Sequence, residues 1–412
     1  MTRRAAVIAT TLAAALAALL APAGASALDD PPSISAPSAI VMEASTGDVT
    51  YARGADKRRP IASTTKLMTA LLTMEHAKLD EVVPAANYIA APAESQLGLR
   101  PGDRLTVADL LRGLMLESAN DAAETLGEYV GGSRIRFVRM MNRRARELDL
   151  TNTHFANPIG LDAPSNYSSA RDLARLAIAL RAHSFVRKIA DRESATLTSY
   201  GNKVIRNRNT LLGKDPRVNG LKTGHTSQAG YVLVGTRTAS RVTVVSVVLG
   251  TSSYGARDTD SLNLLKWGTA QYRRVRPILR GETISTEPVI KYRRGATLPL
   301  VLDGSVSRIV RTDANITMDD RDVPKEVTGP IRAGQRFGYR EVFADGKRIA
   351  AVPIVSSSSV PAADFPQRTK DWFTRPLAIL VAALILGGTV WMARRLRRPP
   401  RREPSRSEPE TA

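Results

Sequence analysis

The first two thirds of the chain mix two hydrophobic periods. Strand-like runs at residues 39–42 and 49–52 flank the turn sequence Ser45-Thr46-Gly47-Asp48, and together they predict a β-hairpin. Apolar residues recur every three to four positions in three further segments, residues 63–77, 106–116 and 169–182. This spacing places the apolar side chains on one face of a helix, so it predicts three amphipathic helices.

Two of these predicted helices begin with a capping signal. A hydroxyl residue is followed three positions later by a carboxylate in two pairs, Thr106/Asp109 and Ser169/Asp172.

Later in the chain, β-branched runs at 231–235 and 242–249 predict a second hairpin, with 236–241 between the strands, and a helical pattern follows it. Because the helices lie between N-terminal and C-terminal strands, the order predicts an α/β or α+β domain with a mainly antiparallel sheet.

The helical period disappears after about residue 277. Short strand-like runs then alternate with Gly, Asp and Pro turns at 287–292, 297–302, 307–311, 316–318, 326–328, 337–343 and 347–354. This pattern predicts a small all-β domain over 277–355, after a first domain over 28–276. Residues 356–375 are rich in Ser and Pro, which is typical of a linker.

Both ends of the chain carry membrane-related patterns. Residues 1–27 combine basic residues, an Ala/Leu-rich run and the sequence Ala25-Ser26-Ala27, as in a secretory signal peptide, although an uncleaved anchor has a similar start. Residues 376–393 carry no charge and, as a helix, extend about 27 Å, which predicts a transmembrane span. Six arginines follow this stretch directly, so we expect the tail at 394–412 to lie in the cytoplasm. The same arginines argue against the alternative that this stretch is a buried core helix.

The formal net charge of the 412-residue chain is +20, a value that by itself favours a nucleic-acid partner. The tail at 394–412 holds +4 of this charge and the signal peptide another +2, so the exported part keeps +14. A basic domain outside the membrane suits an anionic envelope surface better than DNA, and we expect no nucleic-acid partner. The chain has no cysteine, which excludes disulfides, cysteine nucleophiles and cysteine metal ligands. It has only four histidines, and no two are three to five residues apart, so a pair of metal-binding histidines on one helix face is excluded too. We therefore expect no metal and no other cofactor.

Lysine is scarce in this basic chain, and one lysine stands in a distinctive place. Only 12 of the 59 basic residues are lysine, and only Lys66 has a serine, Ser63, three positions before it. On a helix these two side chains share a face. A desolvated lysine can lose its proton and act as a base, whereas arginine cannot. Taken alone, the pair also fits a capping serine with a solvated lysine.

Two later motifs offer complementary groups. Ser118 and Asn120 supply a hydroxyl that can relay a proton and an amide that can hold a substrate carbonyl. Lys222 and Thr223 supply a charge and a hydroxyl for a carboxylate, and Gly224 lets a substrate backbone lie against a strand. Each motif alone is more commonly a helix cap or a turn.

The ordered set S-x-x-K, S-x-N and K-T-G resembles the motifs of penicillin-binding proteins and class A β-lactamases. Further stretches look like the low-molecular-mass penicillin-binding proteins of the D-alanyl-D-alanine carboxypeptidase family, at residues 60–70, 101–103, 153–155, 160–162, 167–172 and 207–209. The resemblance covers roughly residues 38–275. It implies a penicillin-binding/β-lactamase-like transpeptidase fold with an antiparallel sheet and a helical subdomain, followed by the small all-β domain where that family carries its C-terminal domain.

The resemblance also implies serine acyl transfer on peptidoglycan stem peptides, with no cofactor. Ser63 attacks the carbonyl between two D-alanines, and Lys66, kept neutral by burial, takes its proton. Ser118 and Lys222 help to deliver the proton to the departing D-alanine, while Asn120 holds the substrate amide. Water then hydrolyses the acyl-enzyme, and β-lactam antibiotics are expected to acylate the same serine.

The resemblance assigns the remaining positions to substrate binding. Thr223 and a nearby cation bind the terminal carboxylate, and the backbone N–H groups of Ser63 and His225 form the oxyanion hole. Two arginines stand where the family has active-site arginines, Arg208 and Arg257. In an arginine-rich chain, both equally fit ordinary surface positions.

Two other functions, a β-lactamase and a non-catalytic penicillin-binding protein, share parts of this pattern. A secreted β-lactamase of class A needs a Glu-x-x-Leu-Asn signature, and the nearest segment, residues 147–151, has Thr151 where Asn is expected. A non-catalytic penicillin-binding envelope protein would retain the fold without the chemistry, and the intact motifs oppose it. Members of the family are often held by an amphipathic C-terminal helix, whereas this sequence predicts a full hydrophobic span.

Overall fold

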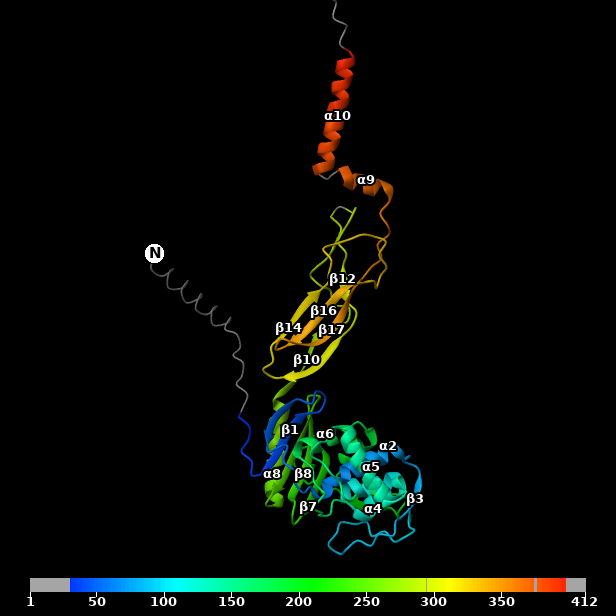
Figure 1. Cartoon of the computed structure of the whole chain (residues 1–412), viewed down its shortest axis with the longest axis vertical. Helices are drawn as coiled ribbons and strands as arrows, with labels where there is room; N and C mark the ends of the chain where they lie inside the picture. Colours follow the sequence, from blue (N-terminus) through cyan, green and yellow to red (C-terminus); the bar gives the residue numbers. More distant parts are fainter. Residues whose placement is uncertain (1–29, 294, 374–375, 398–412) are drawn as a thin grey trace, which may run out of the picture. The chain divides into compact units, whose positions relative to one another are not determined.

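The computed structural model describes residues 30–293, 295–373 and 376–397 (Figure 1). It contains two compact units. Within the described residues, the first comprises 30–275 together with Ile309–Ala314, and the second comprises Arg276–Arg308 and the described part of the chain from Asn315. The predicted signal peptide and most of the predicted cytoplasmic tail lie outside the described residues.

The centre of the first unit is a five-stranded antiparallel sheet in the order β2-β1-β9-β8-β7. Its strands are β1 (Ser38–Glu43), β2 (Val49–Arg53), β7 (Val218–Thr226), β8 (Gly230–Ala239) and β9 (Val242–Thr251). The expected antiparallel sheet is therefore confirmed. β1 pairs with β9, with Ser38 opposite Leu249, so the start of the unit joins a strand two hundred residues further along.

Both predicted hairpins are present, and the second is tighter than expected. β8 and β9 extend into the segment predicted as a loop and leave only Ser240 and Arg241 between them. Both residues have positive φ, 50° and 65°. A two-residue turn of this kind matches the right-handed twist of the adjoining strands, which is why the strands remain paired up to it.

Alternate residues of the sheet face two different cores. On β1, Ile40 and Met42 belong to the core shared with the helical cluster, whereas Ala39 and Val41 belong to the core shared with α8 (Tyr254–Ala270). Figure 1 shows α8 on one side of the sheet and the cluster on the other. The cluster consists of α2 (Lys66–His76), α3 (Val107–Arg112), α4 (Asn120–Gly131), α5 (Arg134–Glu147), α6 (Ala170–Arg181) and α7 (Ser184–Ala190).

The predicted caps are confirmed, but two predicted helices have irregular ends. Thr106 Oγ1 accepts from the N–H of Asp109, and Ser169 Oγ accepts from the N–H of Asp172, each at 3.2 Å. The helix expected over 63–77 begins as a 3₁₀ turn, Ala62–Thr65, and becomes α-helical only at Lys66. The helix expected over 106–116 leaves α geometry after Arg112 and ends in a π-helical turn, Gly113–Glu117. Both departures lie beside the predicted motifs.

Short paired strands complete the first unit: β3 (Val82–Pro84) with β4 (Arg104–Thr106), and β5 (Ser194–Leu197) with β6 (Lys203–Arg206). The strand-rich second unit has a four-stranded sheet in the order β12-β17-β16-β14. These strands are β12 (Leu300–Leu302), β14 (Ile316–Arg321), β16 (Arg336–Ala344) and β17 (Lys347–Ser356). The other strands in this part of the chain are β10 (Tyr272–Ile278), β11 (Val289–Ile290), β13 (Val306–Arg311) and β15 (Glu326–Val327). The core of the second unit includes Leu298, Val342 and Ile354, from three separate strand-like runs.

The C-terminal segment contains two helices. The first, α9 (Phe365–Phe373), falls where the sequence analysis expects only a linker. The second, α10 (Pro376–Leu396), includes the stretch Ile379–Leu396, whose mean hydropathy is 1.6. By length and composition this stretch can cross a membrane, and none of it is buried against the rest of the described chain.

Candidate active site

A cavity of about 490 Å³ in the first unit collects most of the predicted site residues. Its lining includes Ser63, Ser118, Arg208, Thr223, Gly224, His225 and Arg257. The other three, Lys66, Asn120 and Lys222, are buried beside it and reach it through hydrogen bonds. The structure therefore brings together residues from three motifs that lie up to 160 positions apart.

Ser63 is held in a turn that depends on two glycines. The preceding residue, Ala62, has a positive φ of 46°. A Cβ on Gly160 would lie 2.1 Å from the carbonyl oxygen of Ala62, and a Cβ on Gly224 would lie 2.9 Å from the backbone nitrogen of Ser63. Gly224 was predicted to make room for a substrate backbone. The structure shows that it also makes room for the backbone of the serine itself.

Lys66 is in contact with Ser63 and is completely buried. Its Nζ is 3.0 Å from Ser63 Oγ, 2.5 Å from Asn120 Oδ1 and 2.5 Å from the carbonyl oxygen of Ile159. Burial lowers the pKa of Lys66 to about 7, and the carboxylate of Glu94 opposes part of this shift. A neutral amine at this position has a lone pair available to accept the proton of the Ser63 hydroxyl.

The second and third motifs meet at Ser118. The π-helical turn ends there, and Ser118 adopts a left-handed conformation with φ of 66°. The Nζ of Lys222 donates to Ser118 Oγ at 2.8 Å and to the carbonyl oxygen of Thr223 at 3.0 Å. Burial lowers the pKa of Lys222 well below its ordinary value, and the neighbouring cations Lys66 and Arg208 lower it further.

The two candidate arginines line the same cavity but are held differently. The guanidinium of Arg208 pairs with Glu117 at 2.6 Å, and its side chain is 49% exposed. Arg257 is buried, donates two hydrogen bonds to Asp258 Oδ1 at 2.7 and 3.0 Å, and stacks on the ring of Tyr254. Arg257 is thus fixed in position before any ligand binds, whereas Arg208 can move at smaller cost.

One polar group beside the site was missed by the sequence analysis. Glu94 accepts hydrogen bonds from Asn120 Nδ2 and from the hydroxyl of Tyr88, both at 2.5 Å. It lies in the irregular segment between β3 and β4, 26 residues before Asn120. No periodic pattern or motif marks this position, so only the folded structure reveals the contact.

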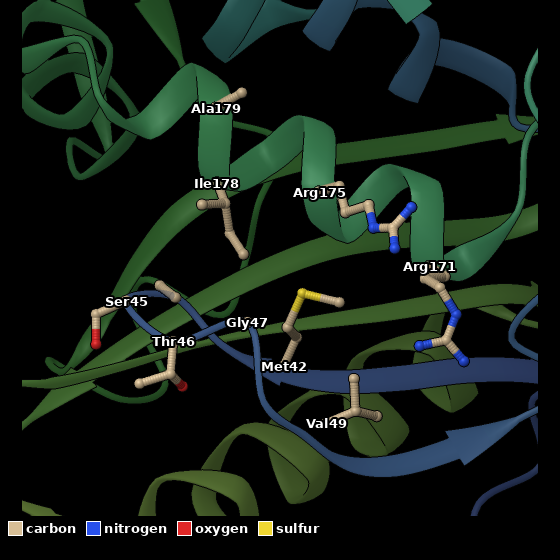
Figure 2. Close-up of a pocket in the computed structure, with 10 residues that line it drawn as sticks. Met42, Ser45, Thr46, Gly47, Val49, Arg171, Arg175, Ile178 and Ala179 are labelled. Carbon is tan, nitrogen blue, oxygen red and sulfur yellow. The ribbon is translucent and has the colours of Figure 1, made fainter. Parts of the chain in front are cut away.

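A second cavity, of about 500 Å³, lies between α6 and the β1–β2 hairpin (Figure 2). Figure 2 shows Arg171 and Arg175 reaching toward it from α6, and Met42 and Val49 lining it from the hairpin. The two arginines are already engaged, Arg171 by Asp56 at 2.7 Å and Arg175 by the carbonyl oxygen of Asp149 at 2.9 Å. This cavity contains none of the three motifs, so the candidate active site is the cavity at Ser63.

Comparisons with known proteins identify the family of this chain. A family model described as D-alanyl-D-alanine carboxypeptidase matches residues 25–253. The chain belongs to this family. The D-alanyl-D-alanine carboxypeptidases are serine peptidases, so the resemblance drawn from the motifs is confirmed, and the chain is a serine-type D-alanyl-D-alanine carboxypeptidase.

Individual D-alanyl-D-alanine carboxypeptidases match over most of the chain. DacD of Escherichia coli (strain K12) is 33% identical over 368 residues, which cover 83% of this chain and 91% of the relative. A D-alanyl-D-alanine carboxypeptidase of Streptomyces sp. (strain K15) is 34% identical over 287 residues, which cover 65% of this chain and 99% of the relative. Among solved structures, penicillin binding protein 5 from Haemophilus influenzae has a TM-score of 0.59 at 30% identity, covering 81% of this chain and 99% of that chain.

The segment weighed for the β-lactamase alternative lies apart from the cavity lining. Glu147, the residue that would activate a water molecule, stands at the end of α5, where its side chain is 49% exposed and pairs with Arg144 at 3.1 Å. An exposed carboxylate bound to arginine is a poor general base. The geometry therefore disfavours the β-lactamase alternative.

Proposed function

We propose that this carboxypeptidase is anchored in the cell membrane and removes the terminal D-alanine from peptidoglycan stem pentapeptides through an acyl-enzyme on Ser63. We propose also that penicillins acylate the same serine, and that the enzyme takes part in peptidoglycan remodelling. The observation that carries the proposal is the 3.0 Å approach of Lys66 Nζ to Ser63 Oγ. Lys66 is the basic group in contact with this hydroxyl, and its pKa of about 7 makes it a base near neutral pH.

The first half of the reaction forms the acyl-enzyme. Ser63 Oγ bonds to the carbonyl carbon between the two D-alanines as its proton passes to Lys66 Nζ. The backbone N–H groups of Ser63 and His225 stabilise the oxyanion. The C–N bond then breaks, and the proton held by Lys66 passes to the leaving nitrogen by way of Ser118, whose Oγ is 2.8 Å from Lys222 Nζ, so that Lys66 is neutral again for the second half.

The second half returns the free enzyme. Water attacks the ester carbonyl, Lys66 takes the proton of this water, and Ser63 Oγ leaves with a proton. During both steps Asn120 holds the substrate amide, and the terminal carboxylate of the pentapeptide binds Thr223 with Arg257 and Arg208. Thr223 and both arginines line the cavity, which supports this placement.

The membrane part of the proposal rests on α10. Its apolar stretch is followed by arginines, so a cytoplasmic tail and an extracytoplasmic catalytic unit fit the positive-inside rule. We propose accordingly that 1–27 is a signal peptide, 28–276 the catalytic domain and 277–355 a separate β-rich domain. The match to the Streptomyces relative covers 99% of that protein but only 65% of this chain. This supports a catalytic domain that can act without the remaining part of this chain. Removal of 376–412 should release the enzyme from the membrane fraction.

The decisive experiment measures two products of the same preparation. Full-length enzyme in detergent is incubated with a pentapeptide ending in D-Ala-D-Ala, and released D-alanine is measured; a second sample is labelled with fluorescent penicillin. We expect release and covalent labelling, both abolished in Ser63→Ala. Ser358→Ala, at an exposed serine of the second unit, should match the wild type. Equal labelling of Ser63→Ala would contradict the mechanism, and rapid penicillin turnover without D-alanine release would favour a β-lactamase.

A further inference from the structure

The segment between β3 and β4 touches the active site through consecutive residues. Ala93 and Ser95 line the cavity, and the carbonyl oxygen of Ser95 accepts from the backbone N–H of Asn120 at 2.7 Å. Between them, Glu94 turns its carboxylate to the side chain of the same asparagine, at 2.5 Å. The segment therefore binds Asn120 by both its main chain and its side chain.

The carboxylate of Glu94 is itself firmly held. Its Oε2 accepts from Tyr88 as well as from Asn120, and its Oε1 accepts from the backbone N–H of Ala91 at 3.0 Å. Further along, Asp121 accepts from three successive backbone N–H groups of the segment, those of Leu97, Gly98 and Leu99. A group anchored by this many bonds loses little entropy in holding another residue.

The chemistry of the two groups determines which way the amide of Asn120 points. An ionised carboxylate only accepts hydrogen bonds, so the NH₂ group of Asn120 must face Glu94 and the Oδ1 atom must face Lys66. Neutral Lys66 keeps two N–H bonds, so it can still donate to Asn120 Oδ1 and to the carbonyl oxygen of Ile159 while its lone pair faces the hydroxyl of Ser63. Glu94 and Lys66 therefore fix the same orientation of the amide from its two ends.

Glu94 also places a negative charge near the base. The charged groups that act on Lys66 are the carboxylates of Glu94, Glu124 and Asp121 and the cations Arg208 and Lys222. Among the carboxylates, Glu94 raises the pKa of Lys66 most. The neighbouring Glu124 is mostly buried, with its own pKa raised to about 7, so it is a less dependable source of negative charge at neutral pH.

We propose that Glu94 is a positioning residue for acylation: it locks the amide of Asn120 and places a negative charge near the buried amine of Lys66. This inference rests on the proposed serine acyl transfer and adds to it a dependence on the β3–β4 segment. Because the side chain contacts Asn120 and not the cavity, it acts through Asn120 and Lys66 and not on substrate.

The test compares the pH dependence of penicillin acylation in full-length variants. Glu94→Gln keeps an oxygen that can accept from Asn120 and Tyr88 but removes the charge. We expect its plateau rate to stay within about threefold of the wild type while the acidic limb of the profile moves to lower pH, by about half a unit or more. Glu94→Ala should show the same shift and also lose about 10- to 100-fold in plateau rate. Glu326→Gln, an exposed carboxylate on β15 of the second unit, is the matched control and should leave the limb in place.

A double variant separates positioning from a general loss of structure. If Glu94 acts through Asn120, Glu94→Ala combined with Asn120→Ala should acylate about as slowly as Asn120→Ala alone. Additive losses, or an acidic limb unmoved in Glu94→Gln, would overturn the inference while leaving the proposed function intact. Failure of the wild-type enzyme to acylate at all would instead reject the proposed function.

Discussion

Lys66 and Lys222 reach the same cavity from different structural elements and meet opposite electrostatic surroundings. Lys66 stands at the first turn of α2 and faces carboxylates, those of Glu94, Glu124 and Asp121. Lys222 stands on the edge strand β7 and faces cations, those of Lys66, Arg208 and Arg257. Both lysines are completely buried, so the loss of hydration acts on both alike.

The difference suits the two lysines to the different tasks proposed for them. Burial lowers both pKa values, but the carboxylates on the helix side keep the pKa of Lys66 near 7, where it can gain and lose a proton. The cations on the strand side push the pKa of Lys222 further down. The two arginines on that side are already paired with Glu117 and Asp258, but each guanidinium has further N–H donors that an anionic peptide terminus could use, in keeping with its proposed binding of the substrate carboxylate.

The largest effect is expected from Lys66→Arg. This change keeps a positive charge but removes the base, because a guanidinium does not lose its proton in a protein. Acylation by fluorescent penicillin should fall by about 10³-fold or more. Lys188→Arg, the same substitution at an exposed position on α7, is the control. Preserved acylation in Lys66→Arg would show that Lys66 is not the base.

Lys222→Arg should be less severe, with about 10²-fold slower acylation. The variant loses the 2.8 Å contact to Ser118 and brings a permanent charge among cations, but it leaves the proposed base in place. D-alanine release and penicillin acylation should both be measured, because each breaks a C–N bond whose nitrogen takes a proton, but only in the former does the amine leave the site. A loss as large as that of Lys66→Arg would mean that the two lysines share one role.

Substitutions of Arg257 and Arg208 should affect substrate binding to different degrees, because Arg257 is buried and Arg208 is half exposed. Arg257→Gln removes a buried, pre-positioned cation and should raise the KM for the pentapeptide by about 10- to 100-fold. Arg208→Gln removes a cation that is half exposed and paired with Glu117, so its effect should be only a few-fold. Steady-state D-alanine release at constant pH tests both variants, and the reverse order would contradict the assignment.

A smaller effect is expected from pH in the wild-type enzyme. With a pKa of about 7, the neutral fraction of Lys66 rises from about a tenth at pH 6 to about nine tenths at pH 8. Since the neutral form is the proposed base, acylation should rise about tenfold over this range and then level off. A rate that falls with rising pH would reject a neutral lysine as the base.

Several features near the site follow from local sequence, and others do not. The capping hydroxyls of Thr106 and Ser169 were predicted from neighbours three residues away, and the structure contains both bonds. The 3₁₀ turn at Ser63 and the π-helical turn before Ser118 were not predicted, because their side-chain patterns are those of ordinary helices. Their geometry depends on distant packing, such as the close approach of Gly160 to the backbone of Ala62.

The three motifs, the family and the antiparallel character of the sheet were predictable from residue types and from the order of the elements along the chain. The motifs and the helix caps depend on spacings of a few positions, which local sterics and hydrogen bonding translate directly into structure. The pairing of β1 with β9 does not, because Ser38 meets Leu249 only in the folded chain. The tertiary structure decided which groups surround each lysine: Asn120 reaches Lys66 across 54 positions and Ser118 reaches Lys222 across 104. Burial and neighbouring charge set a pKa only after the chain has folded, so the contrast between the two lysines, and the contact of Glu94 with the site, emerge only from the packed structure.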